Sequence, residues 1–223
     1  RDSKIQAILP LRGKVLNTER ARLDKMYANA ELVSLIKALG VGVGDQFDIA
    51  GLRYYKIVFM TDADVDGAHI STLLLTFFFR YMPEVIKAGH VYLAKPPLFG
   101  LIKGTGSGRK IEFIYNEDAL ESVLEKRINE RVAAGTKVDE TAERFKQAGY
   151  TAQQRFKGLG EMDASQLWET TMNPKNRTLI RVNIEDAEKA DAIFTKLMGD
   201  EVDLRKNFIQ SRATTVDLDD LDF

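Results

Sequence analysis

Residues 56–67 read KIVFMTDADVDG, and this stretch decides the fold class of the chain. An apolar run that ends in turn-forming residues is typical of a buried strand in a parallel α/β sheet. Asp62, Asp64 and Asp66 follow it at every second position. Carboxylates crowded together repel one another and favour a bound cation, and oxygen ligands without His or Cys favour Mg²⁺. The stretch therefore predicts a magnesium site beyond the carboxyl end of a strand, where ligands of open α/β sheets bind. The alternative is a solvated Asp-rich turn.

The residues after Gly67 change from a period of two to a period of 3.6, which predicts one amphipathic helix that ends at Gly89. A second short strand is expected at 91–94, so the unit is a βαβ crossover with parallel strands. His69 lies in the first turn of the predicted helix. It is either a capping or packing residue, or a side chain that faces the same cleft and contacts phosphate.

The rest of the chain suggests an α/β domain followed by a mainly helical region. Apolar runs at 98–103 and 110–115 predict a hairpin around a glycine-rich tip, and a further strand is expected at 5–11. We predict a domain at 1–115, a mainly helical domain at 116–210 and an acidic flexible tail at 211–223.

Composition limits the classes of protein that the chain can represent. It has 223 residues, a formal net charge of −1 and no cysteine, which excludes disulfides and thiolate metal sites. No apolar run is long enough to span a bilayer, so we expect a cytoplasmic protein without a membrane partner. The first 22 residues nevertheless hold six basic groups and two acids. Among them Arg12 and Lys14 flank Gly13, and Asn17 follows, a grouping that can reach phosphates.

Two other interpretations of the acidic stretch fail on inspection of its spacing. A calcium-binding EF-hand loop needs a glutamate at its twelfth position and a helix before it, whereas Leu73 occupies that position and a strand precedes. Aspartyl-phosphate phosphotransferases generally follow D-x-D-x-[Thr/Val], and here Asp66 replaces the last residue.

Four long motifs, in this order, resemble the B subunits of bacterial type IIA topoisomerases, which comprise DNA gyrase and topoisomerase IV. They are LPLRGKVLNTERAR (9–22), MTDADVDGAHISTLLLTFFFRYMP (60–83), GHVYLAKPPL (89–98) and QRFKGLGEMDASQLWETTMNP (154–174). The resemblance implies a Toprim domain, a Rossmann-like parallel sheet with flanking helices, followed by the carboxyl-terminal tail of that subunit. The motifs favour gyrase over topoisomerase IV without separating the two.

The resemblance also implies roles for particular residues. Asp62 and Asp64 would be Mg²⁺ ligands, with Asp66 a nearby contributor and Mn²⁺ or Ca²⁺ as possible substitutes. Lys14 and Asn17 correspond to DNA-contacting positions, and Arg12 and His69 are further candidates in the cleft where quinolone-type drugs act. Members of the family cleave double-stranded DNA through a tyrosine of the A subunit in an A2B2 assembly, pass a second duplex and reseal the break with the help of ATP.

One departure from the family pattern matters for activity. The family carries an EGDSA motif on the first Toprim strand, whose glutamate completes the metal site and acts as general acid/base, and this motif does not occur here. The ATP-binding region is also absent from the sequence. We therefore expect a fragment with no catalytic residue of its own that neither cleaves DNA nor hydrolyses ATP alone. The alternatives are a non-catalytic DNA-binding or assembly module, or another Toprim nuclease or primase.

Overall fold

A computed structural model describes residues 1–215 of the chain, which divide into two compact units. The first, here called the hairpin unit, consists of Arg1, Asp62–Asp64 and Ala94–Leu179. The second, here called the sheet unit, consists of Asp2–Thr61, Val65–Leu93 and the chain from Ile180. No helix in the described part of the chain is both long and apolar enough to cross a membrane. The predicted division of the chain at residue 115 stays a prediction.

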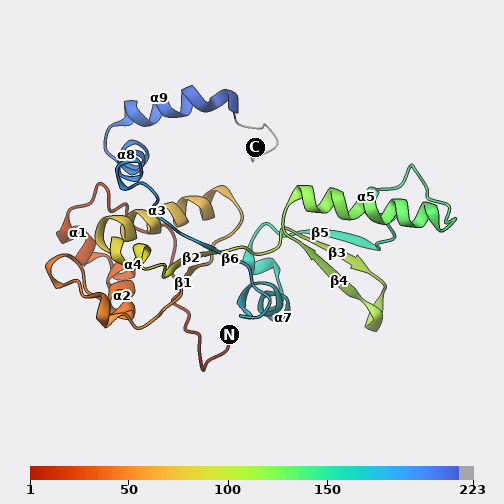
Figure 1. Ribbon diagram of the computed structural model, residues 1–223, viewed down its shortest axis with the longest axis horizontal. Helices are drawn as coiled ribbons and strands as arrows, with labels where there is room; N and C mark the ends of the chain where they lie inside the picture. Colours follow the sequence, from red (N-terminus) through yellow and green to blue (C-terminus); the bar gives the residue numbers. More distant parts are fainter. Residues whose placement is uncertain (216–223) are drawn as a thin grey trace. The chain divides into compact units, whose positions relative to one another are not determined.

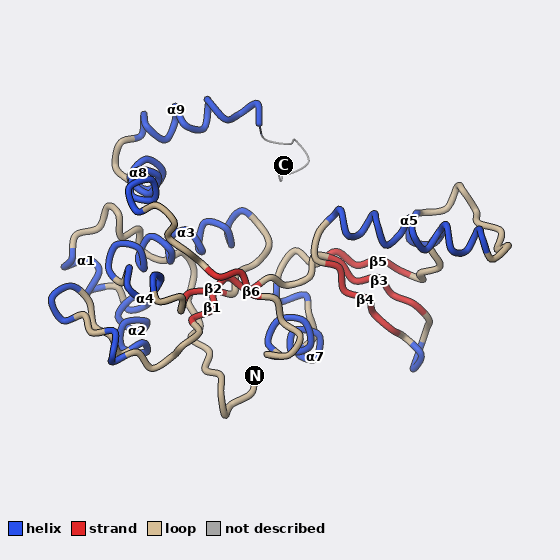
Figure 2. The backbone as a smooth tube through the Cα atoms, viewed as in Figure 1, coloured by secondary structure: helices blue, strands red, loops and turns tan. Residues whose placement is uncertain are grey.

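A parallel strand pair forms the centre of the sheet unit, as the sequence predicts. β1 (Ile57–Phe59) pairs in parallel with β2 (Val91–Ala94), with Ile57 opposite Val91, and β6 (Leu179–Arg181) lies on the other side of β2 (Figure 2). The connection from β1 to β2 runs through α3 (Val65–Tyr81) and α4 (Pro83–Lys87). The mixed α/β fold class and the βαβ crossover are therefore confirmed.

Helix α3 is the main apolar element of the sheet unit. Its Phe77 and Phe78 are completely buried, and Phe78 packs against Phe59 of β1 with ring centroids 5.4 Å apart. α1 (Leu23–Ala28) and α2 (Ala30–Leu39) contribute Met26 and Leu32 to the same core. A full aromatic layer on one helix anchors it against the sheet, since each buried ring removes a large apolar area from water.

The prediction of one helix from Gly67 to Gly89 is wrong at both ends. α3 already begins at Val65, so Gly67 is a buried residue in its first turn. The helix stops at Tyr81 because Pro83 has no N–H and disfavours a helical conformation at Met82, which has φ −143°. Pro83 then opens the separate helix α4, a position that suits its fixed φ.

The predicted strand at 5–11 is also absent from the structure. Residues 5–10 form no secondary structure, and the side chains of Ile5, Ile8 and Leu9 are exposed. An apolar run becomes a strand only where another strand accepts its backbone hydrogen bonds, and in residues 1–215 no strand pairs with this segment.

Two helices follow β6 in the sheet unit. α8 (Ala187–Met198) is capped by the Asp186 carboxylate, which accepts from the Lys189 N–H, and α9 (Val202–Arg212) comes next. Of the predicted flexible tail at 211–223, residues 211–215 complete α9 and a 3₁₀ turn (Ala213–Thr215), and the remainder lies outside the described residues.

An antiparallel sheet in the order β4-β3-β5 forms the hairpin unit. The predicted hairpin is confirmed: β3 (Phe99–Lys103) pairs with β4 (Lys110–Ile114). β5 (Ala152–Arg155), a polar strand that the sequence did not predict, pairs with the other edge of β3. α5 (Glu117–Ala133), capped by Asn116, runs alongside the three strands (Figure 1), and its Leu120 and Leu124 belong to one buried cluster with Phe99 and Leu101 of β3.

Shorter elements complete the two units. In the hairpin unit these are α6 (Arg144–Gln147), α7 (Ala164–Leu167), a π-helical turn (Trp168–Met172) and 3₁₀ turns at Gly106–Gly108 and Leu159–Glu161. In the sheet unit they are 3₁₀ turns at Gly44–Gln46 and Ile49–Gly51.

Candidate metal centre and nucleic-acid interface

The three aspartates of the acidic stretch lie on the connection between β1 and α3. β1 ends at Phe59, Asp62 and Asp64 belong to the turn that follows, and Asp66 lies in the first turn of α3. All three are exposed. The extended conformation therefore stops before Asp62, and a strand period of two does not describe how these carboxylates point. Acidic groups beside a helix N-terminus are nevertheless favoured by the helix dipole.

A hydroxyl pair fixes the residue before the acidic turn. The Thr61 and Ser71 hydroxyls lie 2.9 Å apart in a hydrogen bond, which ties the chain beyond β1 to the second turn of α3. Because both side chains are short, this bond holds the end of the strand close to the helix. The acidic turn thus begins from a fixed backbone position.

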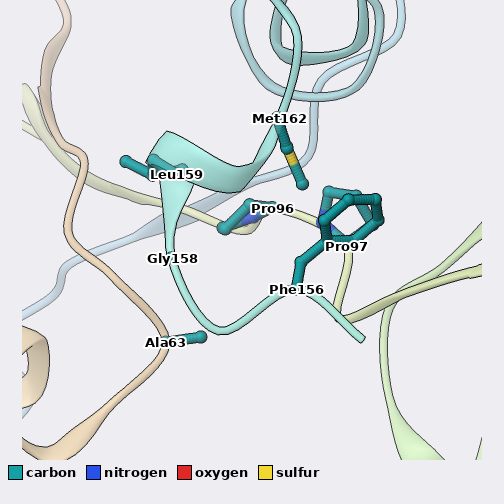
Figure 3. A pocket seen from close by; sticks show the side chains of 7 residues that line it. All are labelled: Ala63, Pro96, Pro97, Phe156, Gly158, Leu159 and Met162. Carbon is teal, nitrogen blue, oxygen red and sulfur yellow. The ribbon is translucent and has the colours of Figure 1, made fainter. Parts of the chain in front are cut away.

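Asp62 is held by a segment nearly a hundred residues away in the chain. The backbone N–H of Leu159 donates to Asp62 Oδ1 at 2.8 Å, and both residues belong to the hairpin unit. In Figure 3 the backbone at Gly158 passes close to Ala63, the neighbour of Asp62. Ala63, Gly158 and Leu159 line a small hollow together with Pro96, Pro97, Phe156 and Met162 (Figure 3). Sequence reasoning placed QRFKGLGEM in a family motif but did not connect it with the aspartates.

Asp66 pairs with Lys14, which belongs to the basic segment near the start of the chain. Lys14 Nζ lies 2.8 Å from Asp66 Oδ1, and both side chains are more than half exposed, at 54% and 68%. Hydrogen bonding and charge from Lys14, with a smaller contribution from His69, hold the pKa of Asp66 below its ordinary value. Gly13 just before has φ +75°, a left-handed conformation that suits glycine. The structure thus brings a predicted DNA contact and a predicted metal contributor together.

Asn17 occupies a different position from Lys14. Its amide Nδ2 donates to the Met198 carbonyl at the end of α8, and its Oδ1 accepts from the Glu19 N–H. Arg20 also binds this helix end, with its guanidinium donating to the Met198 and Gly199 carbonyls. Cationic groups at a helix C-terminus satisfy orphan carbonyls and complement the dipole. The basic segment is therefore anchored to the end of α8.

The other two candidate DNA contacts are exposed. Arg12 lies two residues before Lys14, and His69 lies in the first turn of α3. Sequence reasoning missed a further cluster in the sheet unit, in which Arg80 binds Glu19 and Asp191. Charges of opposite sign that are 61 and 111 residues apart leave no local pattern from which such a pairing could be found.

The donor chemistry of the acidic turn suits a hard cation. Carboxylate oxygens are the ligands that Mg²⁺ prefers, and Mg²⁺ usually takes one or two protein carboxylates together with waters and substrate phosphate oxygens. In residues 1–215 no group of three or more His, Cys, Asp or Glu side chains is arranged to hold a metal. The residues present therefore fit a cation held by a pair of carboxylates, Asp62 and Asp64, rather than one enclosed by a complete protein cage.

Comparison with known families identifies the class to which this arrangement belongs. The family model of the Toprim domain matches residues 1–96, which include the acidic turn and the βαβ unit. A second family model, the carboxyl terminus of the DNA gyrase B subunit, matches residues 148–210. The chain thus contains a Toprim domain, a class of domain that implies divalent-metal binding in general.

Individual relatives narrow the identification further. The chain is 50% identical to the DNA gyrase B protein of Treponema denticola over 98% of its own length and 31% of the relative. It is 51% identical to that of Clostridium acetobutylicum over 97% of the chain and 31% of the relative, and 49% identical to that of Thermus thermophilus over 98% and 32%. The chain belongs to the DNA gyrase B family, the B subunits of type IIA topoisomerases, and spans about a third of the length of these relatives.

Proposed function

We propose that the chain provides the Mg²⁺-binding part of the DNA cleavage and religation centre of an ATP-dependent, gyrase-like type IIA topoisomerase. The observation that supports this best is the continuous match to DNA gyrase B, within which Asp62 and Asp64 follow the central parallel strand. Its proposed partners are double-stranded DNA, an A subunit that carries the nucleophilic tyrosine, and the ATPase region of the B subunit.

In this proposal Asp62 and Asp64 hold the cation and Asp66 contributes nearby charge. When bound, Mg²⁺ supplies charge stabilisation to the scissile phosphate or to its departing 3′ oxygen. Lys14 and Arg12 contact DNA phosphates, which orients the duplex beside the acidic turn. The chain itself offers no general acid/base, and we assign that role to a glutamate in the rest of the B subunit.

The proposal is tested by reconstitution. The chain is combined with the remaining region of a B subunit, an A subunit, DNA and Mg²⁺, and double-strand cleavage is measured on a gel. We expect Asp62→Ala and Asp64→Ala each to lower the cleavage rate by at least about 100-fold, because a catalytic metal ion contributes several kcal/mol to the transition state.

A matched control removes the same charge elsewhere in the chain. Asp45 is exposed in the 3₁₀ turn Gly44–Gln46, so Asp45→Ala should leave cleavage within about twofold of the wild type. Cleavage that survives in both Asp62→Ala and Asp64→Ala at the control level would mean that these carboxylates do not hold the catalytic metal.

A further inference from the structure

The turn that follows β5 is built around a hydrogen bond to Asp62. The Leu159 N–H donates to Asp62 Oδ1 at 2.8 Å, and Gly158 lies just before this donor. The two partners are 97 residues apart in the chain and belong to the same unit. The contact is therefore a tertiary feature that depends on the fold of the hairpin unit.

The turn is held rigidly from both sides. Within it the Lys157 N–H donates to Glu161 Oε2 at 3.0 Å, and the Glu161 N–H donates to the Gly158 carbonyl at 3.2 Å. Before it, the Phe156 N–H donates to the Leu98 carbonyl at 2.8 Å, and the Phe156 ring is buried. A donor on such a turn is fixed in space, which is what a positioning group requires.

Gly158 owes its identity to the carboxylate and not to its backbone conformation. Its φ of −146° is extended and open to any residue. A Cβ at this position would lie 3.1 Å from both Cγ and Oδ1 of Asp62 and 3.3 Å from Oδ2. Gly160, two residues on, would place a Cβ where no other atom lies within 4 Å. Close approach to Asp62 is thus specific to Gly158.

We propose that the Gly158–Leu159 turn positions the Asp62 carboxylate for metal binding, an inference that rests on the proposed role of Asp62 as a ligand. The N–H of Leu159 orients the carboxylate, and the missing side chain at Gly158 leaves room for it. Each carboxylate oxygen has two lone pairs, so one hydrogen bond leaves acceptor capacity for a cation. Partners that orient a metal ligand typically change metal affinity about 10–100-fold when they are removed.

The test measures Mn²⁺ binding to the whole chain by electron paramagnetic resonance, in which the signal of free Mn²⁺ falls on binding. Gly158→Ala should weaken Mn²⁺ binding at least about tenfold. Gly160→Ala should leave it within about twofold, because its new methyl group meets nothing. The melting temperature of each variant is recorded beside the affinity, and we expect both variants to remain folded.

A double-mutant cycle with Asp62→Asn separates positioning from a general structural effect. Once the carboxylate is gone, adding Gly158→Ala should cause no further loss of Mn²⁺ affinity, since the turn then has no ligand to orient. A full additional loss in the Asp62→Asn background would overturn the proposal. If Gly158→Ala lowers the melting temperature, the same comparison is made with an ester in place of the Gly158–Leu159 amide, which removes the N–H and adds no atom beside Asp62.

The outcomes distinguish this inference from the function on which it rests. If Asp62→Asn binds Mn²⁺ as tightly as the wild type, Asp62 is not a ligand and the proposed metal site itself fails. If Asp62→Asn weakens binding while Gly158→Ala and the ester do not, the metal site stands and the positioning role of the turn is refuted. Equal losses in Gly158→Ala and Gly160→Ala would also refute it.

Discussion

Replacing Arg80 by methionine should destabilise the sheet unit substantially, because this guanidinium joins three separate segments. From the end of α3 it binds Glu19 with two bonds, Nε to Oε2 at 2.5 Å and Nη2 to Oε1 at 2.8 Å. It also binds Asp191 of α8 and donates to Thr195 Oγ1 at 3.2 Å. The Phe79 and Phe194 rings stack beside it at 4.8 Å. The cluster thus holds α8 and the segment around Glu19 on α3.

The expected cost follows from the burial of the partners. The Glu19 side chain is 11% exposed and that of Arg80 is 25% exposed, so removing the cation leaves a largely buried carboxylate unpaired. Breaking a buried pair costs about 3–5 kcal/mol, and the partial exposure of Arg80 lowers this to about 2–3 kcal/mol. In a chain of this size that corresponds to a fall in melting temperature of roughly 4–12 °C.

Urea unfolding followed by far-ultraviolet circular dichroism measures this cost. Arg22→Met is the matched control, since Arg22 pairs with Asp24 at 3.5 Å with its side chain 88% exposed, and it should cost less than about 0.5 kcal/mol. The double variant Arg80→Met, Glu19→Met should recover part of the loss, because it removes the unpaired charge as well. The reasoning is refuted if Arg80→Met costs no more than Arg22→Met, or if the double variant is less stable than Arg80→Met.

Two further predictions concern charge and pH. Lys14→Met should flatten the dependence of log DNA affinity on log salt by about one unit and raise Mn²⁺ affinity about two- to fivefold, since it also frees Asp66 from its ion pair. Lys37→Met, at an exposed lysine of α2, should change neither quantity. Burial, together with a hydrogen bond to Glu112, raises the pKa of Tyr150, so the free energy of unfolding falls as pH rises above the unfolded value of about 10. Tyr150→Phe should cost about 1 kcal/mol near pH 8, and this difference should shrink by about pH 11 in urea titrations; a constant difference would contradict the assignment.

The elements with strong local patterns could be predicted from the sequence. The apolar run before Asp62 identified β1, and the turn signals around residues 104–109 identified the β3–β4 hairpin. Asn116, a good N-cap residue before an apolar repeat, located the start of α5. In each case the signal lies within a few residues of the structure that it specifies.

Elements whose conformation depends on a distant neighbour could not be predicted in this way. The polar strand β5 shows no apolar pattern and owes its conformation to the free edge of β3. The run at 5–11 has the composition of a strand, yet in residues 1–215 nothing pairs with it. The end of α3 was predictable in principle, because Pro83 lies within the apolar repeat, and periodicity was wrongly given more weight than the proline.

The candidate site divides along the same line. The spacing of Asp62, Asp64 and Asp66 located it, because carboxylates clustered after a strand are a local pattern. The hydrogen bond from Leu159 to Asp62 bridges 97 residues and is specified by the fold alone. A glycine such as Gly158 is ambiguous in a sequence, since it serves equally as a turn residue or as a point of close approach.

The most direct test of the central claim, that Asp62 and Asp64 hold a divalent cation, is paramagnetic broadening of backbone amide signals by Mn²⁺. In the wild-type chain the signals of residues 62–66 and of Leu159, whose N–H contacts Asp62, should broaden first as Mn²⁺ is added. In Asp62→Asn and Asp64→Asn the same signals should need much more Mn²⁺ to broaden. Broadening that begins elsewhere in the chain, or that is unchanged in both variants, would contradict the claim.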